Sequence, residues 1–269
     1  MQWITLEQRY IESTKQQPST DYTKQTTPLG SLWKLFVYAY LQDTQIQEPI
    51  YQCRRTDKIK GDEFCCNQEE SLDRDTALVR SCGNYFAPKR LGITEQDWSR
   101  YWQRSAPQAK WMHSLSNMQP ATSVMVEDIL QVLQQMPQPT VKSARTALLG
   151  RLLQPEWQSA LTQMGSAYRF KTYTWDDPKR PGAYVGGAAG WLADGRVFWI
   201  GGRGRSKDVI QRISPMLPAA LAPSNTAAGQ SCVQVDFLHR YPLRKVTLQG
   251  ADKAITGTLR GAYVAHLAN

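Results

Sequence analysis

Between residues 31 and 165 the apolar residues fall in several stretches of helical spacing, and after residue 165 they mostly follow a strand-like alternation. The segment 31–41 (SLWKLFVYAYL) is apolar on nearly every side, which is typical of a helix buried on most of its faces. Further helices are predicted where helical spacing meets a cap, a glycine or a proline, at 94–105, 126–136, 141–153 with Thr140 as N-cap, and 156–164. A short strand is predicted at 3–6, and 44–92 is predicted to be rich in loops.

The later part of the chain predicts an antiparallel sheet. Three strands are expected in succession, at 167–175, 183–192 and 196–200, with a tight turn at Asp194 and Gly195 between the last two. A helix at 206–217 follows them. Helices, then a three-stranded meander, then a closing helix together predict an α+β fold in which helices pack on an antiparallel sheet.

After Pro223 the pattern consists of short strands alone, at 233–238, 246–248 and 254–259. This change divides the chain into a main domain, 1–220, and a small β-rich C-terminal segment, 221–269. Because the chain ends at Asn269 on another strand-like stretch, one expectation is that this segment is incomplete there.

The balance of charge points to anionic partners. The 269 residues include 32 Lys and Arg against 23 Asp and Glu, a formal net charge of +9. The basic residues are scattered and never occur five in a row, so a solvated basic surface is predicted and no nucleic-acid partner. No stretch approaches the roughly 18 apolar residues that a membrane span needs, so no transmembrane segment is predicted.

Four of the five cysteines fall within thirty residues, in the loop-rich stretch: Cys53, Cys65, Cys66 and Cys82. They form no C-x-x-C pair and the three histidines are far apart, so no metal site is predicted. Local disulfides are expected, with reduced structural thiols as the alternative, and the sequence leaves all three pairings open. Disulfides imply an oxidising compartment, so a periplasmic or secreted location is predicted; the N-terminus lacks the features of a signal peptide.

The strongest chemical signal is Ser31-Leu-Trp-Lys34 at the start of the most apolar helix. Residues three apart share a helix face, so the lysine amine can reach the serine hydroxyl. A serine hydroxyl becomes a good nucleophile only when a base removes its proton, and apolar surroundings near a helix N-terminus favour the neutral amine that can do so. Ser31 is the only serine with a lysine three residues later, and a lysine in so apolar a helix needs a reason to be buried.

Two further motifs follow along the chain: Ser81-Cys82-Gly83, and then Lys171-Thr172-Tyr173 on the strand predicted at 167–175. With Ser31-Leu-Trp-Lys34 they resemble the three elements of the penicillin-binding protein and serine β-lactamase superfamily, an S-x-x-K, a motif such as S-x-N, and a strand motif such as K-T-G. The resemblance covers about residues 20–220. It is closest to an uncharacterised secreted proteobacterial branch found alongside bacterial α2-macroglobulins, on the stretches SCGNYFAP, FKTYTW and GGAAGWLADG.

The resemblance implies a function and a set of roles. Ser31 would be the acylated nucleophile, Lys34 its general base, and Ser81 a relay that returns a proton to the leaving nitrogen. Lys171 and Thr172 would bind a substrate carboxylate, and the backbone N–H groups of Ser31 and Thr174 would hold the oxyanion. The implied activity is that of a D-alanyl-D-alanine peptidase or transpeptidase on a cell-wall peptide or a related carboxylate-ended substrate, without a cofactor.

Two departures from the superfamily pattern support an alternative. The middle motif ends in Gly83, with Asn84 displaced by one position, and Tyr173 stands where the superfamily usually has glycine. Tyr173 is expected beside the substrate, where its side chain would narrow or close the cleft. The alternative function is therefore a catalytically inactive module that binds peptidoglycan or an envelope protein such as a bacterial α2-macroglobulin.

Overall fold

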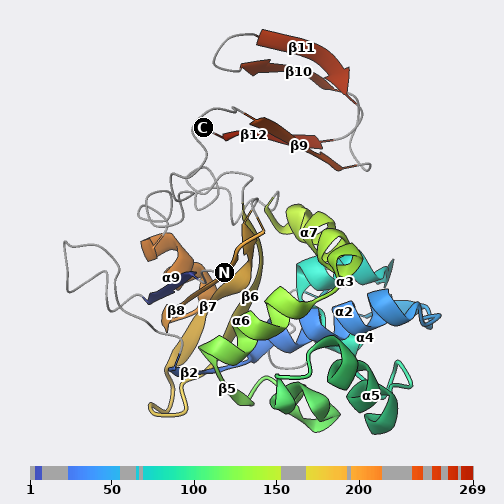
Figure 1. The fold of residues 1–269 in the computed structure, drawn as a ribbon, viewed down its shortest axis with the longest axis vertical. Coiled ribbons are helices and arrows are strands. Elements are labelled where there is room, and N and C mark those ends of the chain that lie inside the picture. The colour runs from blue at the N-terminus through green and yellow to red at the C-terminus, as the bar shows by residue number, and fades with distance from the viewer. Residues whose placement is uncertain are drawn as a thin grey trace.

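The computed structural model describes residues 4–7, 24–54, 65–66, 69–152, 168–192 and 195–213, and four strand backbones between 232 and 268. Side chains are described at 24–54, 65–66, 69–148, 168–192 and 195–213. The elements form a main sheet, a helical layer and several two-stranded pairs (Figure 1). This α+β arrangement, with helices packed on a largely antiparallel sheet, confirms the predicted fold class.

The main sheet has four strands in the order β1–β8–β7–β6. The predicted meander is present as three antiparallel neighbours, β6 (Tyr168–Asp176), β7 (Tyr184–Leu192) and β8 (Val197–Arg203). The predicted N-terminal strand is also present, as β1 (Ile4–Glu7), and it pairs with β8 in parallel. Thus β6 is an edge strand of this sheet, with only one neighbour among the described strands.

The two faces of the sheet are covered differently. Side chains alternate along a strand, so Phe170 on β6 lies on the opposite face from Lys171. The face of Phe170 packs against α9 (Ser206–Ile213), the closing helix that the sequence predicted. The other face joins the helical layer in one core, to which the sheet contributes Tyr173, Ala189, Trp191, Val197 and Trp199.

Helix α2 (Trp33–Thr44) runs through the middle of the helical layer. It follows a 3-10 turn, η1 (Gly30–Leu32), and contacts α3 (Arg74–Arg80), α4 (Gly83–Phe86) and α7 (Gln138–Leu152). Every side chain from Trp33 to Leu41 is buried, because helices surround α2 on most sides as its apolar pattern predicted. Its aromatic contacts reach α5 (Glu95–Ser105), where Phe36 meets Trp102 edge-on and Tyr40 meets Trp98.

The predicted helices that fall on described residues are present, one of them with a corrected start, and the structure adds α3 and α4 in a stretch predicted to be rich in loops. Thr94 is the N-cap of α5, since its hydroxyl accepts from the Asp97 N–H at 3.1 Å. Helix α6 (Val126–Gln135) is also present as predicted. Thr140 is not an N-cap, because α7 already begins at Gln138. The sequence pattern predicts that this helix begins after Pro139. Proline is nevertheless tolerated in a first helical turn, because the backbone N–H groups there have no partner within the helix. The helix predicted at 156–164 lies outside the described residues.

The remaining elements are short or lie near the C-terminus. The stretch 44–92 contains two helices, α3 and α4, besides its loops and the pair β3 (Tyr51–Cys53) and β4 (Glu70–Leu72). Strand β2 (Thr26–Pro28) pairs with β5 (Ser123–Met125), and 3-10 turns lie at η2 (Lys110–His113) and η3 (Leu115–Asn117). The C-terminal strands form two antiparallel pairs, β9 (Cys232–Leu238) with β12 (Ala262–Ala268), and β10 (Arg244–Gln249) with β11 (Ala254–Leu259).

Candidate functional site

The turn that carries Ser31 lies directly against the edge strand β6. Gly30, at the start of η1, has a φ of +46°, and a Cβ placed on it would lie 2.9 Å from the Thr174 carbonyl oxygen and 3.0 Å from the Thr174 nitrogen. Only a residue without a side chain allows the two backbones to approach so closely. This contact holds the start of α2, and with it Ser31, beside the strand that carries Lys171.

Replacing Gly30 by alanine is therefore expected to destabilise the fold by more than the cost of a positive φ, which is about 1–2 kcal/mol. The added Cβ must also push β6 away at Thr174. Gly92 is a matched control, since it has a φ of +64° and a Cβ added there would meet nothing within 4 Å. Chemical denaturation of both variants measures the difference; an equal loss of stability in Gly30→Ala and Gly92→Ala would show that the contact with Thr174 is unimportant.

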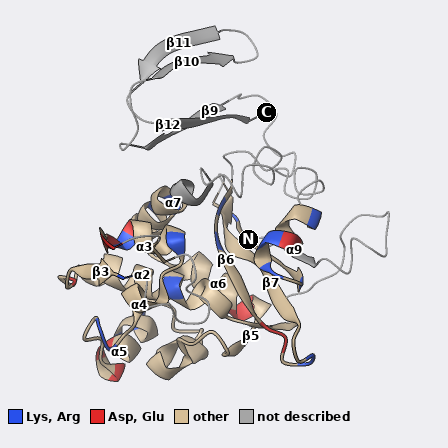
Figure 2. Cartoon of the chain, turned by 180° about the vertical axis from the view of Figure 1, so that it is seen from behind, with Lys and Arg blue, Asp and Glu red and all other residues tan. Residues whose placement is uncertain are grey.

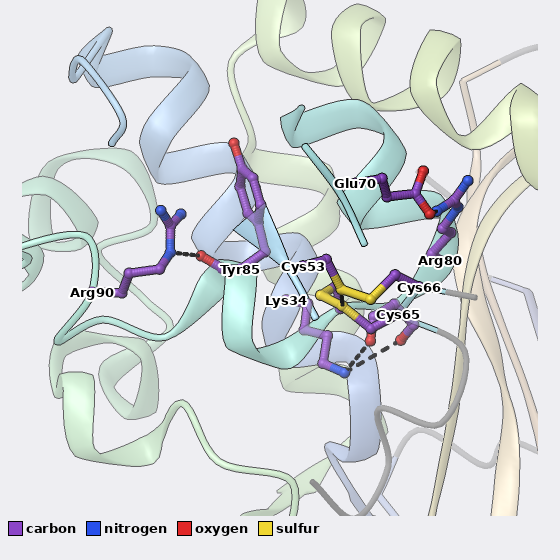
Figure 3. The surroundings of a disulfide bond; sticks show 10 residues. Lys34, Cys53, Cys65, Cys66, Glu70, Arg80, Tyr85 and Arg90 are labelled. Atoms are coloured by element: carbon purple, nitrogen blue, oxygen red, sulfur yellow. Dashed lines mark hydrogen bonds and ion pairs between the residues drawn. A yellow bond between two sulfur atoms is a disulfide. The ribbon is translucent and has the colours of Figure 1, made fainter. Parts of the chain in front are cut away.

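Lys34 lies one turn into the helical segment and is 3% exposed. Its amine donates a hydrogen bond to the backbone carbonyl of Ser81 and lies 3.5 Å from the Ser81 hydroxyl (Figure 3). Ser81 belongs to the second predicted motif, 47 residues further along the chain. The first two motifs therefore meet in space.

Lys171 reaches the same hydroxyl from the sheet. Its side chain is 2% exposed, and its amine donates to Ser81 Oγ at 2.8 Å and to the Thr172 carbonyl at 3.1 Å. Lys171 stands in the middle of β6, on the face that looks toward the helical layer. The Ser81 hydroxyl thus contacts two buried amines, one from a helix and one from the sheet.

Three buried basic side chains, those of Lys34, Lys171 and Arg169, belong to this region. Burial disfavours the charged form of an amine, and a second amine on the same hydroxyl disfavours it further. Arg169 stands two residues before Lys171 on the same face of β6 and is also buried. Burial, with a smaller contribution from Arg145, lowers the pKa of Arg169 to about 10, so this guanidinium remains charged at neutral pH. A permanent cation close by makes it costly for Lys34 and Lys171 both to be protonated.

The backbone at Ser81 is held in a special conformation. Ser81 ends α3 in the left-handed region with a φ of +60°, and its N–H donates to the Leu78 carbonyl at 3.2 Å. The next residue, Cys82, is fully buried, donates its N–H to the Ala77 carbonyl at 2.9 Å and forms a disulfide with Cys65. A helix end and a covalent bond therefore position the hydroxyl that the two lysines share.

The expectation of local disulfides is confirmed. Of the three pairings that the sequence left open, the structure has Cys53–Cys66 and Cys65–Cys82. The two bonds touch, since the sulfurs of Cys53 and Cys65 lie 3.2 Å apart (Figure 3). Cys53, Cys65 and Cys82 lie close enough together to hold a metal ion, and among the described residues they are the one such group. Thiolates bind metals, whereas these sulfurs are disulfide-bonded, so the arrangement does not suit a metal centre in the oxidised protein.

The other predicted residues lie along β6. Thr172 is buried, and the Thr174 hydroxyl accepts a hydrogen bond from the Ser206 N–H at the start of α9 at 2.9 Å. Tyr173 is 1% exposed and its hydroxyl accepts from Thr27 at 3.2 Å. Its side chain is therefore packed into the core on the face of Lys171. The prediction that it narrows or closes a substrate cleft stays a prediction.

The structure thus brings Lys34, Ser81 and Lys171 together and places Ser31 one helical turn before Lys34. Within the described part of the chain, the Ser31 side chain makes no hydrogen bond, and the residue is partly exposed. The sequence reading missed Arg169 as part of this region. Its position two residues before Lys171 on an alternating strand was the available signal, because such residues share a face.

Comparisons with known proteins agree with the location but leave the chemistry open. A model of the family described as "Predicted secreted protein (DUF2300)" matches residues 57–181, which include Ser81 and Lys171. This description confirms the expected periplasmic or secreted location. In the described part of the chain, no helix has both the length and the apolar character that crossing a membrane requires.

The chain is also similar to a longer protein of Escherichia coli (strain K12), "Uncharacterized protein YfaQ". The two are 44% identical over 241 residues, which cover 88% of this chain and 43% of that protein, so the chain spans less than half of its relative's length. Among solved structures, it is similar to the crystal structure of L2 complexed with relebactam, with a TM-score of 0.47 and 10% identity over 75% of this chain and 85% of that one. The chain is therefore similar to a family of predicted secreted proteins over 57–181 and to the E. coli protein over most of its own length.

Proposed function

We propose that the chain is a serine acyltransferase or hydrolase, of the D-alanyl-D-alanine peptidase or transpeptidase type, that forms an acyl-enzyme on Ser31. The observation that carries the proposal is the convergence of the buried Lys34 and Lys171 amines on the Ser81 hydroxyl, beside the turn that carries Ser31. Two amines and a hydroxyl in contact form a path along which protons can move. Such a path is what a serine nucleophile in an apolar site requires.

In the proposed reaction the neutral Lys34 amine takes the proton from Ser31 Oγ, which attacks the carbonyl carbon of the substrate. The developing oxyanion accepts hydrogen bonds from the N–H groups of Ser31 and Thr174, each of which typically lowers the barrier by about 3–4 kcal/mol. The Lys34 ammonium then returns the proton through the Ser81 hydroxyl to the leaving nitrogen, and the C–N bond breaks. Water or an amine attacks the resulting ester and regenerates Ser31.

Lys171 and Thr172 are proposed to bind the carboxylate of the substrate at the end of this path. A protonated Lys171 would attract the carboxylate and keep Lys34 neutral by like-charge repulsion. A peptide that ends in a free carboxylate suits this arrangement, and the net charge of +9 suits the anionic polymer that carries such peptides. The proposed partner is therefore peptidoglycan peptide or a similar carboxylate-ended substrate.

The test is the release of D-alanine from an N-acetylated peptide that ends in D-Ala-D-Ala. We expect release by the unmodified chain and none by Ser31→Ala, because the acyl-enzyme cannot form. Ser71→Ala is the matched control, since Ser71 is exposed on β4. A chain that releases no D-alanine, or a Ser31→Ala variant as active as the control, would contradict the proposal.

A second candidate is an inactive module that binds peptidoglycan or an envelope protein such as a bacterial α2-macroglobulin. The observation in its favour is at the middle motif, where Gly83 is buried in α4 and offers no side-chain amide to a substrate. Under this hypothesis, retention of the chain on purified peptidoglycan would be the same for the unmodified protein and Ser31→Ala, and neither would release D-alanine.

A further inference from the structure

The two disulfides form one cluster of sulfurs next to Ser81. Cys53 pairs with Cys66 and Cys65 pairs with Cys82, the residue that follows Ser81. The Sγ atoms of Cys53 and Cys65 belong to different disulfides, yet they lie only 3.2 Å apart (Figure 3). All four cysteines are buried. Each disulfide therefore lies directly against the other, and no solvent separates the two sulfurs that meet.

The four sulfurs are not equivalent in this cluster. Those of Cys53, Cys65 and Cys82 all lie within 4.8 Å of one another, a group to which Cys66 does not belong. The group thus contains both sulfurs of the Cys65–Cys82 disulfide and a single sulfur of the other. Cys53 is therefore the sulfur that is placed to react with the Cys65–Cys82 bond.

A thiolate in contact with a disulfide can exchange with it. The thiolate attacks one sulfur of the disulfide, a new sulfur–sulfur bond forms, and the other sulfur leaves. Groups that are held in contact react far faster than groups that must first meet by diffusion. The contact between Cys53 and Cys65 already brings the two reacting sulfurs together. Once Cys53 is a free thiol, the nucleophile that opens the second disulfide is in place.

The charges nearby favour Cys82 as the sulfur that leaves. Basic residues lie on β6 and in the helical layer beside it (Figure 2). Two of them, Lys34 and Lys171, donate hydrogen bonds to Ser81, which precedes Cys82 in the chain. A protonated amine close to a thiolate stabilises it, and a more stable thiolate leaves a disulfide faster. Attack on Cys65 is therefore expected to release Cys82.

We propose that the two disulfides form a redox relay, in which reduction of Cys53–Cys66 by a dithiol releases Cys53 to attack Cys65 and thereby frees Cys82. One thiolate of the dithiol attacks Cys66, and the second then closes the reductant's own disulfide, which leaves thiols at Cys53 and Cys66. The Cys53 thiolate next bonds to Cys65, the Cys65–Cys82 bond breaks, and its electron pair leaves on Cys82, which takes up a proton. One dithiol is oxidised, and the chain ends with a Cys53–Cys65 bond and thiols at Cys66 and Cys82.

Entry of the reductant at either of two sulfurs gives this same product. Cys65 and Cys66 are 5% and 4% exposed, against 1% for Cys53 and 0% for Cys82, and a local opening of the fold admits a reductant to them. Attack on Cys65 frees Cys82 directly, and the Cys65 thiol that the dithiol then releases lies against Cys53 and displaces Cys66. The partner is therefore a dithiol reductant, of the chemical class of the thiol–disulfide oxidoreductases.

The relay also links the redox state to the candidate site. The Cys65–Cys82 bond fixes the backbone next to Ser81, whose hydroxyl contacts both buried amines. Freeing Cys82 removes that covalent constraint, so a reductant would regulate the site. This consequence rests on the proposed function, whereas the exchange of sulfurs does not.

The experiment compares two variants that lose the same disulfide and differ in which sulfur remains. Cys66→Ser leaves the Cys53 thiol in contact with Cys65, whereas Cys53→Ser leaves the Cys66 thiol outside the group of three. Both carry Cys232→Ser, which removes the fifth cysteine. The folded variants are quenched with acid, denatured and alkylated at acidic pH, where exchange stops, and the modified peptides are identified by mass spectrometry. We expect at least about tenfold more alkylated Cys82 in Cys66→Ser than in Cys53→Ser.

The unmodified chain keeps the test independent of the folding of either variant. After treatment with one equivalent of dithiothreitol, chains that have lost one disulfide should contain a Cys53–Cys65 bond with Cys66 and Cys82 alkylated, and fragment ions distinguish the adjacent Cys65 and Cys66. Such chains with only an original disulfide, or equal alkylation of Cys82 in the two variants, would overturn the relay. No step involves Ser31, so a chain without acylation activity leaves the result unaffected.

Discussion

Lys34→Met is expected to slow the acylation of Ser31 by a fluorescent penicillin by about 10²–10⁴-fold, the usual contribution of a general base. Methionine has nearly the length of lysine and suits a buried position, so it removes the base and leaves the packing of α2 intact. Lys34→Arg should lose a similar factor, because a guanidinium does not give up its proton and cannot accept the one on Ser31. The second-order rate of labelling measures both.

The control for this prediction is Lys142→Met, an exposed lysine on α7. Its rate should match that of the unmodified chain. If Lys34→Met labels as fast as Lys142→Met, then the contact between Lys34 and Ser81 has no part in proton transfer, and the roles proposed for both residues are wrong.

Removing the Cys65–Cys82 disulfide by the double substitution Cys65→Ser and Cys82→Ser is expected to cost about 2–5 kcal/mol of unfolding free energy. It should also slow acylation strongly, because Cys82 follows Ser81 and fixes the backbone from which the shared hydroxyl projects. Denaturant unfolding gives the first quantity, and the rate of labelling under conditions where the variant remains folded gives the second.

The other disulfide provides the comparison. Cys53→Ser with Cys66→Ser removes a bond that closes a loop of similar length, 13 residues of separation against 17, and leaves Cys82 attached. We expect a similar loss of stability from both pairs, but a larger loss of labelling rate from the pair that includes Cys82. Equal rates for the two variants would show that the covalent bond beside Ser81 serves stability alone.

The sequence predicts the helix and the strand that carry the site residues, but it does not by itself predict that these residues meet in space. Helical spacing places Lys34 one turn after Ser31, and alternation places Lys171 on a strand; both follow from local rules. The meeting of these residues at Ser81, 47 and 90 positions away in the chain, is a tertiary contact that no local pattern contains. It was expected only through the resemblance to the superfamily.

The disulfide pairing and the position of Tyr173 also depend on tertiary contacts that local sequence patterns do not contain. Four cysteines in one loop-rich stretch predict disulfides, but which sulfurs meet depends on the pairing of β3 with β4 and on the packing of α3 against α2. Alternation alone places Tyr173 on the face of Lys171. Its burial against Thr27 follows from the position of β2, which contributes only three residues to the sheet pairs and has a weak pattern of its own.

The most direct test of the account is the mass of the chain, and of its proteolytic peptides, after incubation with benzylpenicillin. If Lys34, Ser81 and Lys171 serve a nucleophile at the start of α2, a single adduct should appear on the peptide that contains Ser31, and Ser31→Ala should remain unmodified. An unmodified natural chain, or an adduct that persists in Ser31→Ala, would contradict the account.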